Sequence, residues 1–220
     1  MSLDFEKVFS TAEHLYHRTD IDNMSVCGEG SQLSMTENVR KELVPFLKKW
    51  NAKSVLDAPC GDCFGMRYVD FEDISYTGGE VQTPQVKKLK ENFPDKNFVR
   101  LDVANDELPE VDIWFCRDCL FHFSNEDKLK TLRNFVSSNI KYILMSNHCG
   151  WTLEEAAKFK AKMNESPRTG GFSHVNWKYA PWNFEEPLDR FYDNYEGHNK
   201  KEMVLYTREQ IKRFLDGEEN

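Results

Sequence analysis

Short apolar runs rich in β-branched residues alternate with stretches whose apolar positions repeat at helical spacing. The short runs predict strands at residues 54–56, 75–81, 97–101, 112–116 and 142–146. The longer stretches predict amphipathic helices at residues 36–50, 83–93 and 125–137. Strands that alternate with helices form βαβ units, so the pattern predicts an α/β fold with a mostly parallel sheet between helices.

The helix expected before the first strand carries a start signal of its own. Thr36 is a candidate N-cap, and Glu37 places an acid in the first turn, where it favours the helix dipole. Leu43, Phe46 and Leu47 fall on one side of this helix. We therefore expect the helix to begin near Thr36 and to pack this side on the sheet.

The alternation stops at residue 150. A helix-like run at 153–163 leads into an aromatic stretch at 166–187 that contains Gly and Pro, which we interpret as a lid or an acceptor-side insertion. Strands predicted at 188–192 and 202–206 would pair as a hairpin and give the sheet an antiparallel C-terminal edge. A last helix is expected at 207–215, before an acidic tail.

Charge and apolar patterning narrow the partners and the compartment. A net charge of -8 disfavours binding to a nucleic-acid backbone, and Lys87, Lys88 and Lys90 fit the solvated face of a helix. No apolar run approaches the ~20 residues that cross a bilayer, and residues 1–7 lack a secretory pattern. We expect an intracellular, cytoplasmic protein without a membrane partner, whose 6 cysteines are free thiols.

The most informative segment is Val-Leu-Asp-Ala-Pro-Cys-Gly-Asp-Cys-Phe-Gly at residues 55–65, where an apolar strand runs into a tight turn. In a doubly wound sheet, ligands bind beyond the carboxyl ends of the strands, so this turn lies at the expected crevice. Gly61 lets the backbone approach a ligand closely. Glu80 follows about 20 residues later, at the end of the second strand, where a carboxylate accepts hydrogen bonds from ribose hydroxyls.

A nicotinamide dinucleotide fold would place an acid at the same position. The turn, however, reads Pro-Cys-Gly-Asp-Cys at residues 59–63 and lacks the G-x-G-x-x-G pattern that seats a pyrophosphate. Its acidic groups would repel a diphosphate but not a cofactor that carries cationic sulfonium and ammonium groups. A nicotinamide oxidoreductase is therefore the disfavoured alternative, and a fluorescence titration with NADH would detect it.

These residues resemble the class I S-adenosylmethionine-dependent methyltransferases. Residues 57–62 are similar to motif I of that family, and Tyr-x-Gly-x-Glu at 76–80 is similar to motif II. The region 115–123 resembles motif IV, and Gly-Glu-Gly-Ser at 28–31 resembles an upstream segment that closes over the cofactor. The resemblance covers residues 28–147 and is weaker through 177–187. Pro59 departs from it, because the family usually has a glycine there.

The resemblance implies a Rossmann-like, doubly wound, seven-stranded sheet with S-adenosylmethionine as cofactor and S-adenosylhomocysteine as product. Asp102 falls where the family contacts the adenine amino group. The cofactor-binding residues that the resemblance implies are Asp57, Pro59, Cys60, Gly61, Asp62, Glu80, Val81, Asp102, Val103, Cys116, Arg117, Gly30 and Ser31.

A chain of 220 residues is long enough for one well-buried core, so we expect a single domain. Its expected parts are N-terminal helices at 1–50, a cofactor-binding core at 51–150, the acceptor-side insertion at 151–187, and a C-terminal hairpin and helix at 188–220.

Methyl transfer to an oxygen or a nitrogen requires an aligned acceptor and a group that removes its proton. The candidates after the fourth and fifth strands are Asp118, His122 and His148. His122 is a base that Asp118 could orient, or a ring that simply packs beside its phenylalanine neighbours, and His148 competes for the same role. Asp118 with Asn147 as divalent-metal ligands is a minority alternative, because the second expected acid is missing.

Two sets of side chains keep a second interpretation open. The Cys-x-x-Cys pairs at 60–63 and 116–119 have the spacing of a zinc site or a redox dithiol, although buried free thiols are the favoured interpretation. The aromatic stretch offers either an acceptor wall or simple packing. Its ring-bearing residues are Trp151, His174, Trp177, Tyr179, Trp182 and Phe184.

Cys-Arg-Asp-Cys at 116–119 is similar to methyltransferase domains found beside glycosyltransferases, including those of large algal viruses. This resemblance implies a sugar hydroxyl on a glycan as the acceptor, a longer glycosyltransferase-containing protein, and the host cytoplasm as the compartment of a viral protein. No Asn/Asp-Pro-Pro-aromatic segment follows the fourth strand, which argues against methylation of nucleobase amino groups. The alternatives are an acceptor that is another small molecule or a protein, and a non-catalytic S-adenosylmethionine-binding module.

Overall fold

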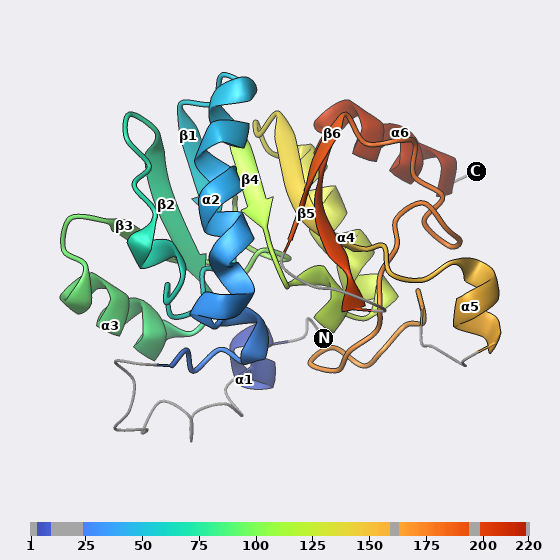
Figure 1. Cartoon of the computed structure of the whole chain (residues 1–220), viewed down its shortest axis with the longest axis horizontal. Helices are drawn as coiled ribbons and strands as arrows, with labels where there is room; N and C mark the ends of the chain where they lie inside the picture. Colours follow the sequence, from blue (N-terminus) through green and yellow to red (C-terminus); the bar gives the residue numbers. More distant parts are fainter. Residues whose placement is uncertain (1–3, 10–23, 159–162, 194–198, 219–220) are drawn as a thin grey trace.

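The computed structural model describes residues 4–9, 24–158, 163–193 and 199–218. Its centre is a seven-stranded sheet in the order β3-β2-β1-β4-β5-β7-β6 (Figure 1). The strands are β1 (Ser54–Asp57), β2 (Ser75–Glu80), β3 (Asn97–Arg100), β4 (Ile113–Cys116), β5 (Tyr142–His148), β6 (Asp189–Tyr192) and β7 (Lys201–Thr207). The predicted mostly parallel sheet with an antiparallel C-terminal edge is confirmed.

The strand order reverses its direction at β1. This strand pairs in parallel with β2 on one side and with β4 on the other, so that Val55 is opposite both Tyr76 and Ile113. Strands β3 and β5 extend the parallel sheet on either side, and β7 runs antiparallel to both β5 and β6. The carboxyl ends of β1 and β4 therefore flank the switch point at which ligands bind in such sheets.

Helices cover both faces of this sheet. The helices of the described residues are α1 (Phe5–Phe9), α2 (Leu33–Lys49), α3 (Thr83–Asn92), α4 (Asn125–Ser137), α5 (Leu153–Lys158) and α6 (Arg208–Glu218), of which α2, α3, α4 and α6 pack on the sheet. Apolar residues of α2 and α3 share one core with Val55, and apolar residues of α4 and α6 share the other core with Leu56. Successive residues of β1 thus point to opposite cores, which explains why this strand is apolar without alternation.

Helix α2 begins three residues before the predicted start. Gln32 is its N-cap residue and makes no side-chain capping bond, while Thr36 lies inside the first turn and donates its hydroxyl to the Gln32 carbonyl. The prediction of Thr36 as N-cap was therefore wrong. Thr36 is buried against the turn that follows β1 (residues 58–65), which is called the motif turn below. The two segments pack so closely that a Cβ added to Gly65 would lie 2.8 Å from the Thr36 hydroxyl oxygen.

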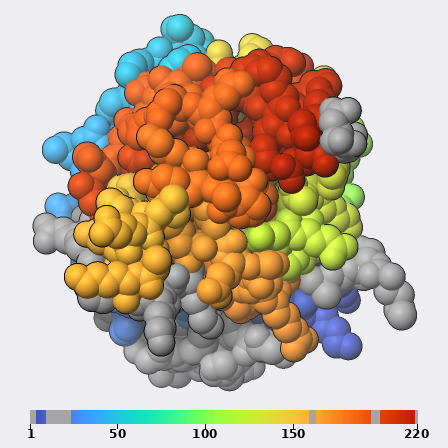
Figure 2. Space-filling view, turned by 90° about the vertical axis from the view of Figure 1, so that its right-hand side faces the viewer, coloured from blue at the N-terminus to red at the C-terminus, as the bar shows by residue number. Residues whose placement is uncertain are grey.

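Three rings of the aromatic stretch after β5, those of Trp177, Trp182 and Phe184, belong to the core. Trp177 and Trp182 are each 1% exposed, and Phe184 packs against Phe214 of α6 and Tyr206 of β7. Packing rather than an acceptor wall is thus the observed role of these rings. Figure 2 shows residues 163–190, in orange, spread over this side of the molecule next to α5 and α6.

Helix α5 starts at Leu153, as predicted, and residues 159–162 of the expected helix lie outside the described residues. In the described parts of the chain, no helix has both the length and the apolar character needed to cross a membrane.

Candidate active site

A cavity of about 670 Å³ opens at the carboxyl ends of the parallel strands. Helix α1 and the start of α2 lie at this end of the sheet (Figure 1). The cavity is lined by twelve of the residues expected to bind a cofactor, namely Asp57, Pro59, Cys60, Gly61, Asp62, Glu80, Val81, Asp102, Val103, Arg117, Gly30 and Ser31. It is also lined by the three residues expected to act on an acceptor, Asp118, His122 and His148. Cys116 is buried in the core and is not part of the lining.

The turn after β1 brings its backbone to the carboxylate at the end of β2. Gly61 has a φ of 55°, and a Cβ at this position would lie 2.9 Å from the Cys27 sulfur. Its N–H donates to Glu80 at 3.1 Å, and the other Glu80 oxygen accepts from the Gln82 N–H at 3.0 Å. Burial raises the pKa of Glu80, although these backbone donors favour its charged form. The Ala58–Pro59 peptide bond that leads into this turn is cis.

Asp57 ends β1 at the floor of the cavity. Its carboxylate accepts a hydrogen bond of 2.7 Å from the Tyr76 hydroxyl. Burial raises the pKa of Asp57 to about 7, and the charge of Glu80 adds to this effect, while Tyr76 and Arg117 oppose it. A cation that entered this part of the cavity would therefore find a carboxyl group that ionises easily near neutral pH.

The other two acids expected at the cofactor have local partners. Asp62 accepts hydrogen bonds from the Ser25 hydroxyl at 2.8 Å and from the Val26 N–H at 2.7 Å. It therefore ties the segment around residues 25–35 to the motif turn. Asp102 accepts from the Ala104 N–H and from the Asn105 side chain. Asp62 and Asp102 therefore line the cavity and also hold neighbouring segments of its wall in place.

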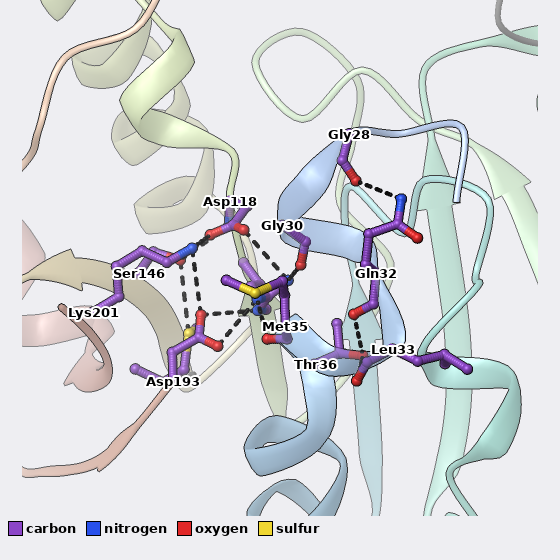
Figure 3. A network of polar contacts seen from close by, with 12 residues as sticks. Gly28, Gly30, Gln32, Leu33, Met35, Thr36, Asp118, Ser146, Asp193 and Lys201 are labelled. Atoms are coloured by element: carbon purple, nitrogen blue, oxygen red, sulfur yellow. Dashed lines mark hydrogen bonds and ion pairs between the residues drawn. The ribbon is translucent and has the colours of Figure 1, made fainter. Parts of the chain in front are cut away.

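Arg117 joins three segments of the chain at the back of the cavity. Its guanidinium donates to both oxygens of Asp193, at 2.9 and 3.1 Å, and to the Gly30 and Met35 carbonyls. In Figure 3, Asp193 and Lys201 lie across from Gly30 and Met35. These contacts position the segment around residues 25–35, and Arg117 also lines the cavity, so its expected contact with a cofactor stays a prediction.

Asp118 has a φ of 51°, and its N–H donates to the Ser146 hydroxyl. Its carboxylate pairs with Lys201 and lies 3.4 Å from Arg117 (Figure 3). Burial opposes ionisation, but these two cations outweigh it and lower the pKa of Asp118 to about 2. The expectation that Asp118 orients the ring of His122 is not met, because the His122 ring is held by the Gly171 carbonyl instead.

The two cavity histidines have opposite backbone partners. His122 Nδ1 lies 2.7 Å from the Gly171 carbonyl, which can only accept, so this nitrogen carries the proton. His148 Nδ1 lies 3.1 Å from the Val175 N–H, which can only donate, so this nitrogen is unprotonated. Burial lowers the pKa of both rings, to about 3 for His148, and both are neutral at pH 7. His122 thus presents a lone pair at Nε2, and His148 presents an N–H.

The metal alternatives do not fit the observed side chains. Asn147 is used by Glu202 and by the Trp177 N–H, and Asp118 is paired with two cations. The four cysteines of the two Cys-x-x-Cys pairs, Cys60, Cys63, Cys116 and Cys119, are buried free thiols, which agrees with the favoured interpretation. The described residues contain no group of three or more His, Cys, Asp or Glu arranged to hold a metal ion.

Sequence reasoning missed several residues of the cavity lining, among them Phe5, Phe9, Phe172 and Lys201. The two rings of α1 stack at 6.3 Å, and Phe5 meets Phe123 at 4.9 Å. Lys201 is the first residue of β7, an antiparallel strand, so its start rather than its end reaches the cavity. Lys201 directly precedes the strand predicted at 202–206, and this position was the signal by which the sequence could have placed it at the cavity.

No protein-family model matches the sequence, and neither does any curated protein. Solved structures do match the fold. Magnesium protoporphyrin IX methyltransferase from Synechocystis PCC 6803 with bound S-adenosylhomocysteine aligns with a TM-score of 0.61 and 14% identity, over 90% of this chain and 95% of that chain. The N-methyltransferase NodS from Bradyrhizobium japonicum WM9 with S-adenosylhomocysteine aligns with a TM-score of 0.60 and 8% identity, over 91% and 97%.

The methyltransferase domain of bacterial CtHen1 aligns with a TM-score of 0.55 and 13% identity, over 79% of this chain and 99% of that domain. At these identities the likeness concerns the fold. The chain therefore has the Rossmann-like fold of methyltransferases, which agrees with the fold that its motifs predicted.

Proposed function

We propose that this protein is an S-adenosylmethionine-dependent methyltransferase that methylates a hydroxyl oxygen of a small molecule. The observation that carries the proposal is a single cavity with two chemically different halves. One half contains the buried carboxyls of Asp57 and Glu80, and the other contains His122 with an available lone pair. The solved methyltransferases of the same fold that contain S-adenosylhomocysteine support the choice of cofactor.

The cofactor half fits the groups of S-adenosylmethionine. Glu80 can accept hydrogen bonds from the ribose hydroxyls, and we assign Asp102, which lines the same cavity, to the adenine amino group. Asp57 supplies a negative charge for the ammonium group. We assign Arg117 and Asp62 to positioning, because their polar atoms hold the segment around residues 25–35 over this half.

In the acceptor half, His122 Nε2 takes the proton of the acceptor hydroxyl while the oxygen forms its bond to the methyl carbon. When bound, S-adenosylmethionine would supply the electrophilic methyl carbon, and the electron pair of its carbon–sulfur bond would remain on sulfur, which would leave S-adenosylhomocysteine. Of the two imidazoles, His122 fits the base, because the lone pair of His148 is occupied by the Val175 N–H. A sugar hydroxyl is one acceptor of this class.

Glu80→Gln is expected to weaken binding of S-adenosylhomocysteine by about 10- to 150-fold, the range for hydrogen bonds to a charged group. The amide keeps the shape of the side chain but removes the negative charge that faces the ribose hydroxyls. Calorimetric titration of both proteins measures the change. Glu91→Gln, at an exposed position of α3, is the matched control and should bind like the wild type.

Absence of binding by the wild type, or equal binding by wild type and Glu80→Gln, would contradict the proposed cofactor site. Binding without turnover of any hydroxyl acceptor would point to a non-catalytic module instead. Turnover is followed by mass spectrometry, as the replacement of one acceptor hydrogen by a methyl group.

Binding of S-adenosylhomocysteine is expected to release a proton from Asp57 near pH 6.5. The pKa of Asp57 is about 7 in the protein alone, so much of this carboxyl is protonated at that pH. An ammonium group beside it favours the carboxylate and expels the proton, so affinity should rise as the pH increases from 6 to 8. Calorimetry in two buffers of different ionisation enthalpy measures the release. Asp57→Asn should abolish it, and release that persists in this variant would assign the proton to another group.

A further inference from the structure

We infer that the acceptor is an uncharged ring compound with two neighbouring oxygens, a hydroxyl that gives its proton to His122 and a second oxygen that accepts a hydrogen bond from His148. This inference rests on the proposed function and specifies its acceptor. It follows from the opposite protonation patterns of the two imidazoles and from the aromatic rings between them.

The backbone fixes both tautomers. A neutral imidazole has one N–H, and the Gly171 carbonyl places it on Nδ1 of His122, whereas the Val175 N–H places it on Nε2 of His148. Among the described residues, neither Nε2 has a hydrogen-bond partner, and both residues line the cavity. His148 is only 3% exposed as a whole, yet it lines the cavity, so a ligand oxygen there could accept a hydrogen bond from its Nε2 N–H.

The two imidazoles flank the same pair of phenylalanines. The Phe121 ring centroid lies 4.5 Å from that of His122 and 5.1 Å from that of His148. The Phe172 centroid lies 6.1 and 5.9 Å from the same two rings. Phe172 is 46% exposed, so its apolar ring is available to the body of a ligand. A ring compound held on Phe172 would therefore lie next to both imidazoles, and we infer that its adjacent oxygens contact them.

The charged side chains behind the two histidines and two phenylalanines form balanced ion pairs. Arg117 and Lys201 are the cations of this group, and each is paired with Asp118 or Asp193. With the two histidines neutral, the cavity offers no unpaired cation to a carboxylate or a phosphate in its described lining. This balance favours an uncharged acceptor, either a planar aromatic diol or a saturated ring such as a sugar.

Two measurements test the inference on the full chain. Nitrogen-15 NMR of the imidazoles, with and without S-adenosylhomocysteine, should show the proton on Nδ1 of His122 and on Nε2 of His148. Titrations of the protein saturated with S-adenosylhomocysteine then compare catechol with phenol, and cis-cyclohexane-1,2-diol with cyclohexanol. In one pair, the diol should bind roughly fivefold tighter than the single alcohol, the ratio for one neutral hydrogen bond. The pair that shows the preference identifies the planar or the saturated ring.

His148→Asn is the discriminating variant, because its amide oxygen can still accept from the Val175 N–H while the distal donor is lost. We expect this variant to bind S-adenosylhomocysteine normally and to bind diol and single alcohol equally. Equal binding within both pairs by the wild type, a preference that survives in His148→Asn, or one common tautomer for both histidines would overturn the inference. Failure to bind S-adenosylhomocysteine would instead contradict the proposed function, and the tautomers would still be measurable in the protein alone.

Discussion

His122→Asn is expected to lower kcat for a hydroxyl acceptor by about 10²- to 10⁴-fold, the usual contribution of a general base. The asparagine amide can still donate to the Gly171 carbonyl, so the loop keeps its hydrogen bond while the distal lone pair is removed. Affinity for S-adenosylhomocysteine should not change, because His122 lies in the acceptor half. Steady-state methylation at saturating cofactor, with calorimetry as the control, separates the two effects.

The pH profile provides a second readout of the same role. Burial lowers the pKa of His122 below its ordinary value of 6.5, while Asp118 raises it and Lys201 and Lys128 lower it. The base form therefore persists at pH 6.5, and kcat should fall only below this pH, as Nε2 takes up a proton from solvent. His122→Asn should lack this acidic limb. A variant that keeps both the limb and most of its kcat would show that another group removes the proton.

Asp193→Ala is expected to reduce the free energy of unfolding by about 3–5 kcal/mol, the cost of breaking a buried ion pair from one side. Asp193 is buried, and its carboxylate holds Arg117 through two hydrogen bonds and lies 3.6 Å from Lys201. Its removal takes one carboxylate away from the buried cations Arg117 and Lys201, which both still pair with Asp118. Urea denaturation measures the loss.

Lys53→Ala is the matched control, because the Lys53–Asp73 pair is exposed and spans 3.5 Å. Its effect should be far smaller than that of Asp193→Ala, because solvent screens an exposed pair. The double variant Asp193→Ala with Arg117→Met should recover part of the loss, since one of the two buried cations is gone. No recovery would mean that Asp193 stabilises the fold through contacts other than the pair.

The sequence was sufficient for the sheet because its strands are buried on both faces. Val55 and Leu56 serve different cores, so the run is apolar throughout and stands out from the amphipathic helices around it. The motif turn and Glu80 were also predictable, since their chemistry depends on a fixed place after β1 and at the end of β2.

Other features depend on which side chains meet, and periodicity does not carry that information. Thr36 has the residue type of an N-cap but is buried under Gly65. Trp177 and Trp182 attract attention as aromatic residues in a loop, yet they fill the core, while the less conspicuous Phe172 reaches the cavity. The partners of His122 come from backbone about 50 positions later, which no local pattern reveals.

The reversal of strand order at β1 also divides the cavity along the chain. In the proposed function, the cofactor half comes from segments up to Val103 and the acceptor half from Asp118 onward, with β4 between them. We therefore expect acceptor choice and cofactor binding to depend on different segments of the chain. An exchange of the residues after β4 between two proteins of this fold should change acceptor preference and leave cofactor binding intact. The exchange must preserve the hydrogen bonds from Arg117 to the Gly30 and Met35 carbonyls, because they link the two parts.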